Sequence, residues 1–125
     1  MEHLLVAGSR TFDDSETFGK IMQENLHGET VIIEGGALGV DTMAREYAIR
    51  NGLEYVEIRP DWKRYGRAAG PKRNDAMTEL AAEHGGRALF FWDGQSKGTA
   101  QCIRSAKKRG LAVKIWNTAE CRYTE

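Results

Sequence analysis

The chain has 125 residues, which is enough for one domain with a single hydrophobic core. Its 18 Lys and Arg residues balance its 18 Asp and Glu residues, so no overall charge attracts nucleic acid or an anionic membrane. The apolar run after Met1 lacks a basic flank and is too short for a signal peptide or a spanning helix. Cys102 and Cys121 have neither metal-ligand spacing nor a secretory context. We expect one cytoplasmic domain over residues 1–125, with no membrane partner.

Apolar runs that predict β-strands alternate with amphipathic stretches that predict helices, and the more central runs lack the alternation of half-exposed strands. The expected strands are Leu4–Ala7, Val31–Ile33, Tyr55–Ile58, Ala88–Trp92 and Ala112–Trp116. Four helices are expected. The first begins at a capping box of Asp13 and Glu16 and stops at Gly28, and the second runs from about Asp41 to Gly52. The third carries Pro71 in its first turn, and the fourth runs from about Gly98 to Arg109. This order predicts an α/β fold, a Rossmann-like three-layer sandwich with a mainly parallel sheet of about five strands.

The loop from Gly35 to Asp41 joins the second expected strand to a helix. Gly35, Gly36 and Gly39 leave backbone N–H groups bare beside a helix N-terminus, where phosphates bind. The loop has no Walker A Lys-Ser/Thr pair and no G-x-G-x-x-G spacing, which disfavours kinases, ATPases and ordinary dehydrogenases. Ligand contact is favoured over mere helix–sheet packing, with Asp41 as the helix N-cap in either case.

Other polar residues are expected at the same edge, because ligands bind at the carboxyl ends of parallel strands. Gly8-Ser9-Arg10 offers a hydroxyl and a cation, or else a tight turn with a solvated arginine. Arg73 and Asn74 start a helix in the most basic segment, and a cationic helix start favours a bound anion over a merely solvated loop. Trp62 either stacks on a base or is a half-buried core aromatic, and the core position is favoured.

The segment Asp93-Gly94-Gln95-Ser96-Lys97-Gly98-Thr99 forms a second phosphate-ready turn before the last helix. Ser96 or Thr99 as an N-cap would compete with a ligand for the same atoms. His3, His27 and His84 are scattered through the sequence, without carboxylates or thiols in ligand spacing. We therefore expect neither a metal site nor a cofactor, and no nucleophile–base pair is evident.

These motifs together resemble the YspA-like, cpYpsA-related SLOG family. The motifs are Gly8-Ser9-Arg10, Gly35-Gly36-Ala37-Leu38-Gly39-Val40-Asp41, Pro60-Asp61-Trp62, Ala69-Gly70-Pro71-x-Arg73-Asn74-x-x-Met77 and Trp92-Asp93-Gly94-x-Ser96-Lys97-Gly98-Thr99. The resemblance implies a SLOG fold that binds nucleotides or nucleotide-derived ligands at the strand ends, often as a dimer. A homodimer is also expected because the last expected strand, with Trp116, has few covers.

Two related families provide alternatives. The chain resembles cytokinin-activating LOG enzymes, which cleave N-glycosidic bonds of nucleoside monophosphates with a Pro-Gly-Gly-x-Gly-Thr-x-x-Glu motif. Gly98-Thr99 matches that motif, but Cys102 stands at the glutamate position and Gln101 beside it is no acid or base. The chain also resembles DNA-processing protein A, which binds single-stranded DNA, through Gly8-Ser9-Arg10, the glycine loop, Arg73-Asn74 and Gly98-Thr99.

The leading prediction is a protein that binds a nucleotide or nucleotide-derived small molecule as a sensor or sequestering module. The predicted ligand-binding residues are Gly8, Ser9, Arg10, Gly35, Gly36, Ala37, Gly39, Asp41, Asp61, Trp62, Arg73, Asn74, Asp93, Ser96, Lys97, Gly98 and Thr99. One alternative is an N-glycosidase or phosphoribohydrolase in which Asp41, Asp61 or Asp93 replaces the glutamate. The other is single-stranded nucleic-acid binding through Lys63, Arg64, Arg67, Lys72 and Arg73.

Overall fold

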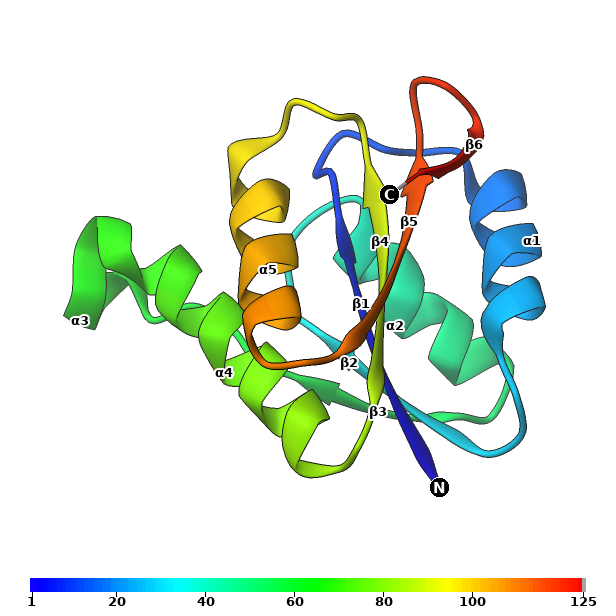
Figure 1. The fold of residues 1–125 in the computed structure, drawn as a ribbon, viewed down its shortest axis with the longest axis horizontal. Coiled ribbons are helices and arrows are strands. Elements are labelled where there is room, and N and C mark those ends of the chain that lie inside the picture. Colours follow the sequence, from blue (N-terminus) through cyan, green and yellow to red (C-terminus); the bar gives the residue numbers. More distant parts are fainter. Residues whose placement is uncertain (125) are drawn as a thin grey trace.

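The protein is a three-layer α/β/α sandwich in a computed structural model, which describes residues 1–124 (Figure 1). Its elements in chain order are β1 (Glu2–Gly8), α1 (Ser15–Asn25), β2 (Thr30–Glu34), α2 (Val40–Arg50), β3 (Glu54–Glu57), α3 (Trp62–Tyr65), the 3-10 turn η1 (Gly66–Ala68), α4 (Ala69–Glu83), β4 (Arg87–Trp92), α5 (Lys97–Lys108), β5 (Ala112–Asn117) and β6 (Arg122–Thr124). The predicted α/β class and alternating order are confirmed.

The sheet has six strands in the order β3-β2-β1-β4-β5-β6. All neighbouring pairs are parallel except β5 and β6, which are antiparallel. The chain first builds outward from β1 to β2 and β3, and then returns to place β4 on the other side of β1. This reversal separates the loops that follow β1 and β4, and such a switch point is where open α/β sheets bind ligands.

The two faces of the sheet carry separate hydrophobic layers. One layer packs β-strand side chains such as Leu5 and Phe90 against Met77 of α4 and Ala106 of α5. The other packs the alternate side chains of the same strands against Phe18 of α1 and against α2. Strands β1 and β4 are therefore covered on both faces, which explains their continuous apolar sequences. No helix within residues 1–124 is long and apolar enough to cross a membrane.

The ends of α1 and the far edge of the sheet differ from the predictions. Asp14 caps α1, accepting a hydrogen bond from the Thr17 N–H at 3.0 Å, so the predicted start at Asp13 is displaced by one residue. The short strand β6 was not predicted, and its Tyr123 packs edge-on against Trp116 with ring centroids 5.1 Å apart. Because Trp116 is covered within the chain, its exposure no longer supports a dimer contact there.

The segment between β3 and α4 was predicted only as a basic loop, but it contains α3 and η1. Asp61 caps α3 by accepting a hydrogen bond from the Arg64 N–H at 3.1 Å. Neither α3 nor η1 contains a buried residue, and Figure 1 shows them projecting from the body beside the start of α4. Trp62 is 58% exposed, so the expectation of a half-buried core position for it is wrong.

Candidate functional site

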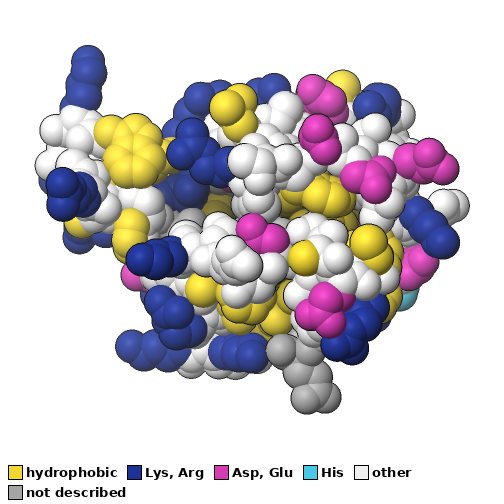
Figure 2. All heavy atoms as spheres, turned by 90° about the horizontal axis from the view of Figure 1, so that it is seen from above, with side chains coloured by type: hydrophobic (Ala, Val, Ile, Leu, Met, Phe, Trp, Pro, Cys, Tyr) yellow, Lys and Arg dark blue, Asp and Glu magenta, His cyan; other side chains and the backbone are white. Residues whose placement is uncertain are grey.

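A pocket of about 740 Å³ opens at the carboxyl ends of the strands, the edge seen in Figure 2. Five segments contribute to it: the end of β1, the loop after β2, the segment after β3, the start of α4 and the start of α5. Most of the predicted ligand-binding residues line it, namely Gly8, Arg10, Gly35, Gly36, Ala37, Asp41, Trp62, Arg73, Asn74, Ser96, Lys97, Gly98 and Thr99. The fold thus brings together residues as far apart in the sequence as Gly8 and Thr99.

Four predicted residues are not in the pocket wall, namely Ser9, Gly39, Asp61 and Asp93. The Ser9 carbonyl accepts a hydrogen bond from the Val40 N–H at 3.3 Å, and a Cβ at Gly39 would lie 2.5 Å from that same carbonyl oxygen. Gly39 also has a φ of 76°, which favours glycine. These two residues therefore pack the β1 and β2 loops together.

The two aspartates shape the backbone. Asp61 caps α3, as described above. The Asp93 carboxylate accepts hydrogen bonds from the N–H groups of Gln95 and Ser96 at 2.9 and 2.8 Å, and these bonds lower the pKa of Asp93. Both carboxylates accept hydrogen bonds from nearby backbone N–H groups and lie outside the pocket wall, so neither is available as an acid or base in the pocket.

Three of the four helices that begin at the pocket have no side-chain cap, namely α2, α4 and α5. The fourth, α3, starts at Trp62 in the pocket wall and is capped by Asp61, whereas α1 begins outside the pocket and is capped by Asp14. The prediction that Asp41 caps α2 is wrong: the N-cap is Gly39, and Asp41 is the second helical residue. Its Oδ2 instead accepts a hydrogen bond from the Ala37 N–H at 3.1 Å. Uncapped helix N-termini carry partial positive charge and bind anions.

The side chains around the pocket add further positive charge. Its wall includes one carboxylate, Asp41, and five cationic side chains, Arg10, Arg59, Arg67, Arg73 and Lys97. The first turns of α4 and α5 contain no acidic residue. A chain with no net charge therefore has a local excess of cations at this pocket. Such a local field attracts an anionic ligand.

Arg73 spans the floor of the pocket and joins α4 to the end of β2. It donates to the Gly35 carbonyl through Nη1 and to Asn74 Oδ1 through Nε, the latter at 2.8 Å. A Cβ at Gly35 would lie only 2.7 Å from Cζ of Arg73, so glycine is needed there to admit the guanidinium. These bonds hold the guanidinium in a defined position before any ligand arrives.

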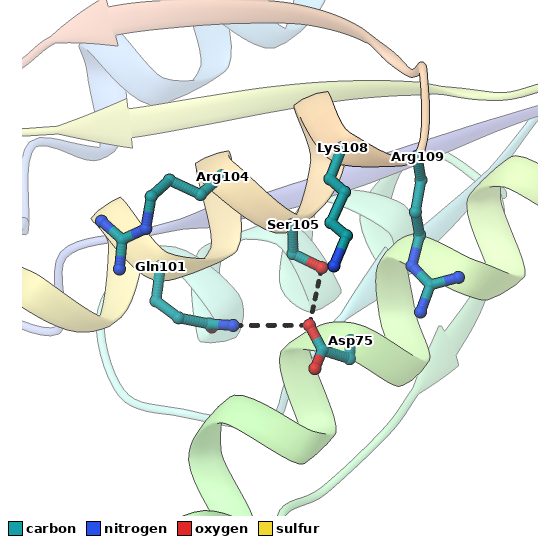
Figure 3. A pocket seen from close by; sticks show the side chains of 6 residues that line it. All are labelled: Asp75, Gln101, Arg104, Ser105, Lys108 and Arg109. Carbon is teal, nitrogen blue, oxygen red and sulfur yellow. Dashed lines mark hydrogen bonds between the residues drawn. The ribbon is translucent and has the colours of Figure 1, made fainter.

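A second cleft, of about 510 Å³, lies between α4 and α5 and is shown in Figure 3. There Asp75 accepts hydrogen bonds from Ser105 Oγ at 2.7 Å and from Gln101 Nε2 at 3.4 Å. The amide oxygen of Gln101 accepts from Asn74 Nδ2 at 2.8 Å. Gln101 therefore connects the second cleft to the floor of the pocket. We interpret this network as bracing that fixes the position of Asn74.

Two buried carboxyl groups lie at the glycine loop. Asp41 is only 5% exposed, and burial raises its pKa to about 6; its Oδ1 has no hydrogen-bond partner. Glu34 is fully buried at the end of β2 and accepts a hydrogen bond from the Gly36 N–H at 2.6 Å. Burial also raises the pKa of Glu34, whose neighbour Glu57 pairs with Arg59. Glu34 was predicted neither as a strand residue nor as part of the site.

The position that carries glutamate in LOG enzymes holds no ionisable acid here. Cys102 is 1% exposed, and burial raises the pKa of its thiol to about 12, so it stays protonated at neutral pH. Asp41 is thus the one acidic side chain in the pocket wall. His3 and His84, which lie far apart in the sequence, stack with ring centroids 4.0 Å apart. Within residues 1–124, no group of three His, Cys, Asp or Glu side chains is arranged to hold a metal ion.

Sequence reasoning also missed several residues of the pocket wall, including Leu38, Arg59, Gly70, Gln101 and Cys102. Leu38 lies inside the glycine motif, and Gln101 and Cys102 follow the Gly98-Thr99 pair by one helical turn or less. Their positions within or beside these motifs could have indicated that they line the pocket. Arg59 lies two residues after the end of β3, in the region where strand-end site residues are found.

Comparison with known proteins places the chain in a family. A family model described as "YspA, cpYpsA-related SLOG family" matches residues 3–65. The Gene 61 protein of Mycobacterium phage D29 is 33% identical over 121 residues, covering 90% of this chain and 94% of that protein.

Among solved structures, the chain is similar to DNA processing protein A from Streptococcus pneumoniae, with a TM-score of 0.52 and 19% identity. That match covers 90% of this chain but only 58% of the other, so the likeness concerns the fold of one part of the larger protein. This chain therefore belongs to the YspA, cpYpsA-related SLOG family, as the match to the family model shows.

Proposed function

We propose that the protein binds a nucleotide or a nucleotide-derived small molecule in the pocket at the carboxyl ends of the strands. The observation that carries this proposal is the convergence of three uncapped helix starts and five cations on one pocket. Each feature stabilises negative charge, and phosphates are the anions that helix N-termini commonly bind. The pocket volume of about 740 Å³ falls within the range of small-molecule sites.

The experiment is a thermal-shift and calorimetric screen of mono-, di- and triphosphates, dinucleotides, ADP-ribose and cyclic nucleotides. A ligand at a hundredfold excess over its Kd stabilises the folded state by about 2.7 kcal/mol, which gives a clear rise in Tm. We expect a selective rise with phosphate-bearing nucleotides. No rise with any of them, and no heat of binding, would refute the proposal.

Matched variants locate the site. Arg10 is exposed in the pocket wall, and Arg10→Ala should weaken binding about tenfold, because a hydrogen bond to a charged group is lost. The control is Arg104→Ala, which removes an exposed cation of α5 in the other cleft. Equal losses in both variants would indicate a general charge effect in place of a pocket.

Single-stranded nucleic acid is a second candidate ligand, and the arm formed by α3 and η1 favours it. The arm and the start of α4 carry exposed cations beside exposed aromatic rings, namely Lys63, Arg64, Arg67 and Lys72 beside Trp62 and Tyr65. Such pairing of cations and aromatics is typical of single-strand binding. The name of DNA processing protein A agrees with this candidate. The test is binding of a labelled oligothymidine against salt: a steep fall is expected, and flat dependence would exclude this mode.

Of the three aspartates considered as catalytic residues of a hydrolase, only Asp41 lines the pocket. Asp41 has a raised pKa, which suits a general acid, whereas Asp61 and Asp93 accept hydrogen bonds from backbone N–H groups in local turns. If the bound nucleotide is also cleaved, free base and a ribose phosphate should accumulate, and Asp41→Asn should stop this while binding remains. No free base after prolonged incubation would leave a binding protein only.

A further inference from the structure

Two large apolar side chains of the pocket wall are left open to solvent. Trp62 of α3 is 58% exposed, and Leu38 of the loop after β2 is 67% exposed. Building on the nucleotide-binding function proposed above, we infer that these two side chains hold the planar base of the ligand. The phosphates then bind at the helix N-termini and cations deeper in the same pocket.

The exposure of Trp62 is unlike that of the other tryptophans. Trp92 is partly buried and donates its indole N–H to the Ser96 carbonyl at 3.0 Å. Trp116 is covered by Tyr123, as described above. The arm that carries Trp62 has no buried residue, so the indole does not serve the core. Figure 2 shows this projecting arm with apolar side chains flanked by dark blue cationic ones.

The indole lies at the border of the cationic part of the pocket. A Cβ at Gly70, in the first turn of α4, would lie 3.5 Å from Cη2 of Trp62, so the ring leans over the start of that helix. The neighbouring aromatic, Tyr65, is already occupied: Arg64 and Lys72 lie over its ring, 5.2 and 4.9 Å from the centroid. Among the described side chains, no cation lies over Trp62 in this way. Trp62 is thus the aromatic surface free to receive a ligand ring.

A tryptophan and a leucine recognise a base by its flat apolar face and not by hydrogen bonds, and every base has such a face. Stacking of one base on an aromatic side chain strengthens binding by about 5- to 150-fold. The inference therefore predicts a ligand with an aromatic ring attached to its phosphates, bound with weak preference among the four bases. Base-free phosphate chains should bind to the same pocket, but less tightly by that factor.

The test compares ATP, GTP, CTP and UTP with tripolyphosphate, using calorimetry on the full chain. We expect each nucleotide to bind at least fivefold more tightly than tripolyphosphate. Trp62→Ala should remove most of this difference and leave tripolyphosphate affinity unchanged, and Trp62→Phe should retain it. Leu38→Ala should act in the same direction. Tyr55→Ala removes an exposed aromatic ring of β3 outside the pocket wall; it is the control and should leave the difference in affinity between nucleotides and tripolyphosphate unchanged. Nucleotides should also quench the indole fluorescence of the wild type but not of Trp62→Phe, which keeps Trp92 and Trp116.

The outcomes separate the two proposals. If nucleotides and tripolyphosphate bind with equal affinity, the base subsite is overturned and the anion pocket stands. If nucleotides bind more tightly but Trp62→Ala keeps the full difference, the base lies elsewhere and the inference is again wrong. If neither nucleotides nor tripolyphosphate bind, the proposed function itself fails.

Discussion

The carboxyl group of Asp41 should make the stability of the protein depend on pH in a specific window. Its pKa rises from 3.8 to about 6 in the folded state, chiefly because the group is buried. The charged form is therefore disfavoured by folding, and the folded state binds this proton more tightly than the unfolded state does. Stability gained from protonation is present below pH 4 and is lost as the pH rises through about 6. At 1.36 kcal/mol per pKa unit, the loss above pH 7 is about 3 kcal/mol.

The perturbation is Asp41→Asn, which removes the charge and keeps an oxygen that accepts from the Ala37 N–H. The assay is urea unfolding of both proteins between pH 3 and pH 8. Glu34 and other groups titrate in both chains, so the difference between the two stability curves reports Asp41 together with the effect of its charge on the pKa of Glu34. We expect the variant to gain up to about 3 kcal/mol relative to the wild type between pH 4 and pH 7. A difference that stays constant over this range would refute the reasoning.

Three further predictions concern the same loops and the thiols. Ser96→Asp should supply the missing side-chain cap of α5 and stabilise the free protein by about 0.5–1 kcal/mol, but its charge should weaken nucleotide binding in calorimetry. Ser96→Asn is the control, because it should cap the helix without repelling phosphate. Unchanged nucleotide affinity in Ser96→Asp would contradict the anion site. Gly8→Ala should cost about 1–3 kcal/mol in urea unfolding, because its Cβ would clash with the backbone carbonyl oxygen of Phe91 and lie 2.8 Å from Cγ2 of Val40. An unaltered midpoint would contradict this. A thiol reagent should label exposed Cys121 quickly and buried Cys102 only on unfolding, so rapid labelling of both would disprove the burial of Cys102.

The parallel sheet and the position of the pocket could be predicted because their signals are local. The apolar runs of β1 and β4 and the glycines after β2 determine where strands end and where N–H groups are open. Asp41 was misassigned as an N-cap because it lies only two residues beyond the actual N-cap, Gly39, and residue type does not distinguish the two positions. The depth at which Glu34 and Asp41 are buried depends on the packing of several elements, which residue type does not reveal.

The outer parts of the molecule were less predictable. Helix α3 has no apolar periodicity in Trp62-Lys63-Arg64-Tyr65, and its only capping signal is a single aspartate. An exposed tryptophan contradicts the usual preference of that residue, so composition pointed to the core. The three-residue strand β6 is too short to show alternation, and it is recognised only by its pairing with β5.

The arm formed by α3 and η1 has a consequence for how members of this family diverge. Because none of its residues is buried, substitutions there are not constrained by core packing, and exposed positions change stability little. The glycines and Arg73, in contrast, are tied to the sheet by close contacts. Selection can thus exchange the basic residues of the arm that lie beyond the Pro60-Asp61-Trp62 motif without rebuilding the floor of the pocket. Related chains should share the floor and Trp62 and differ in the rest of the arm.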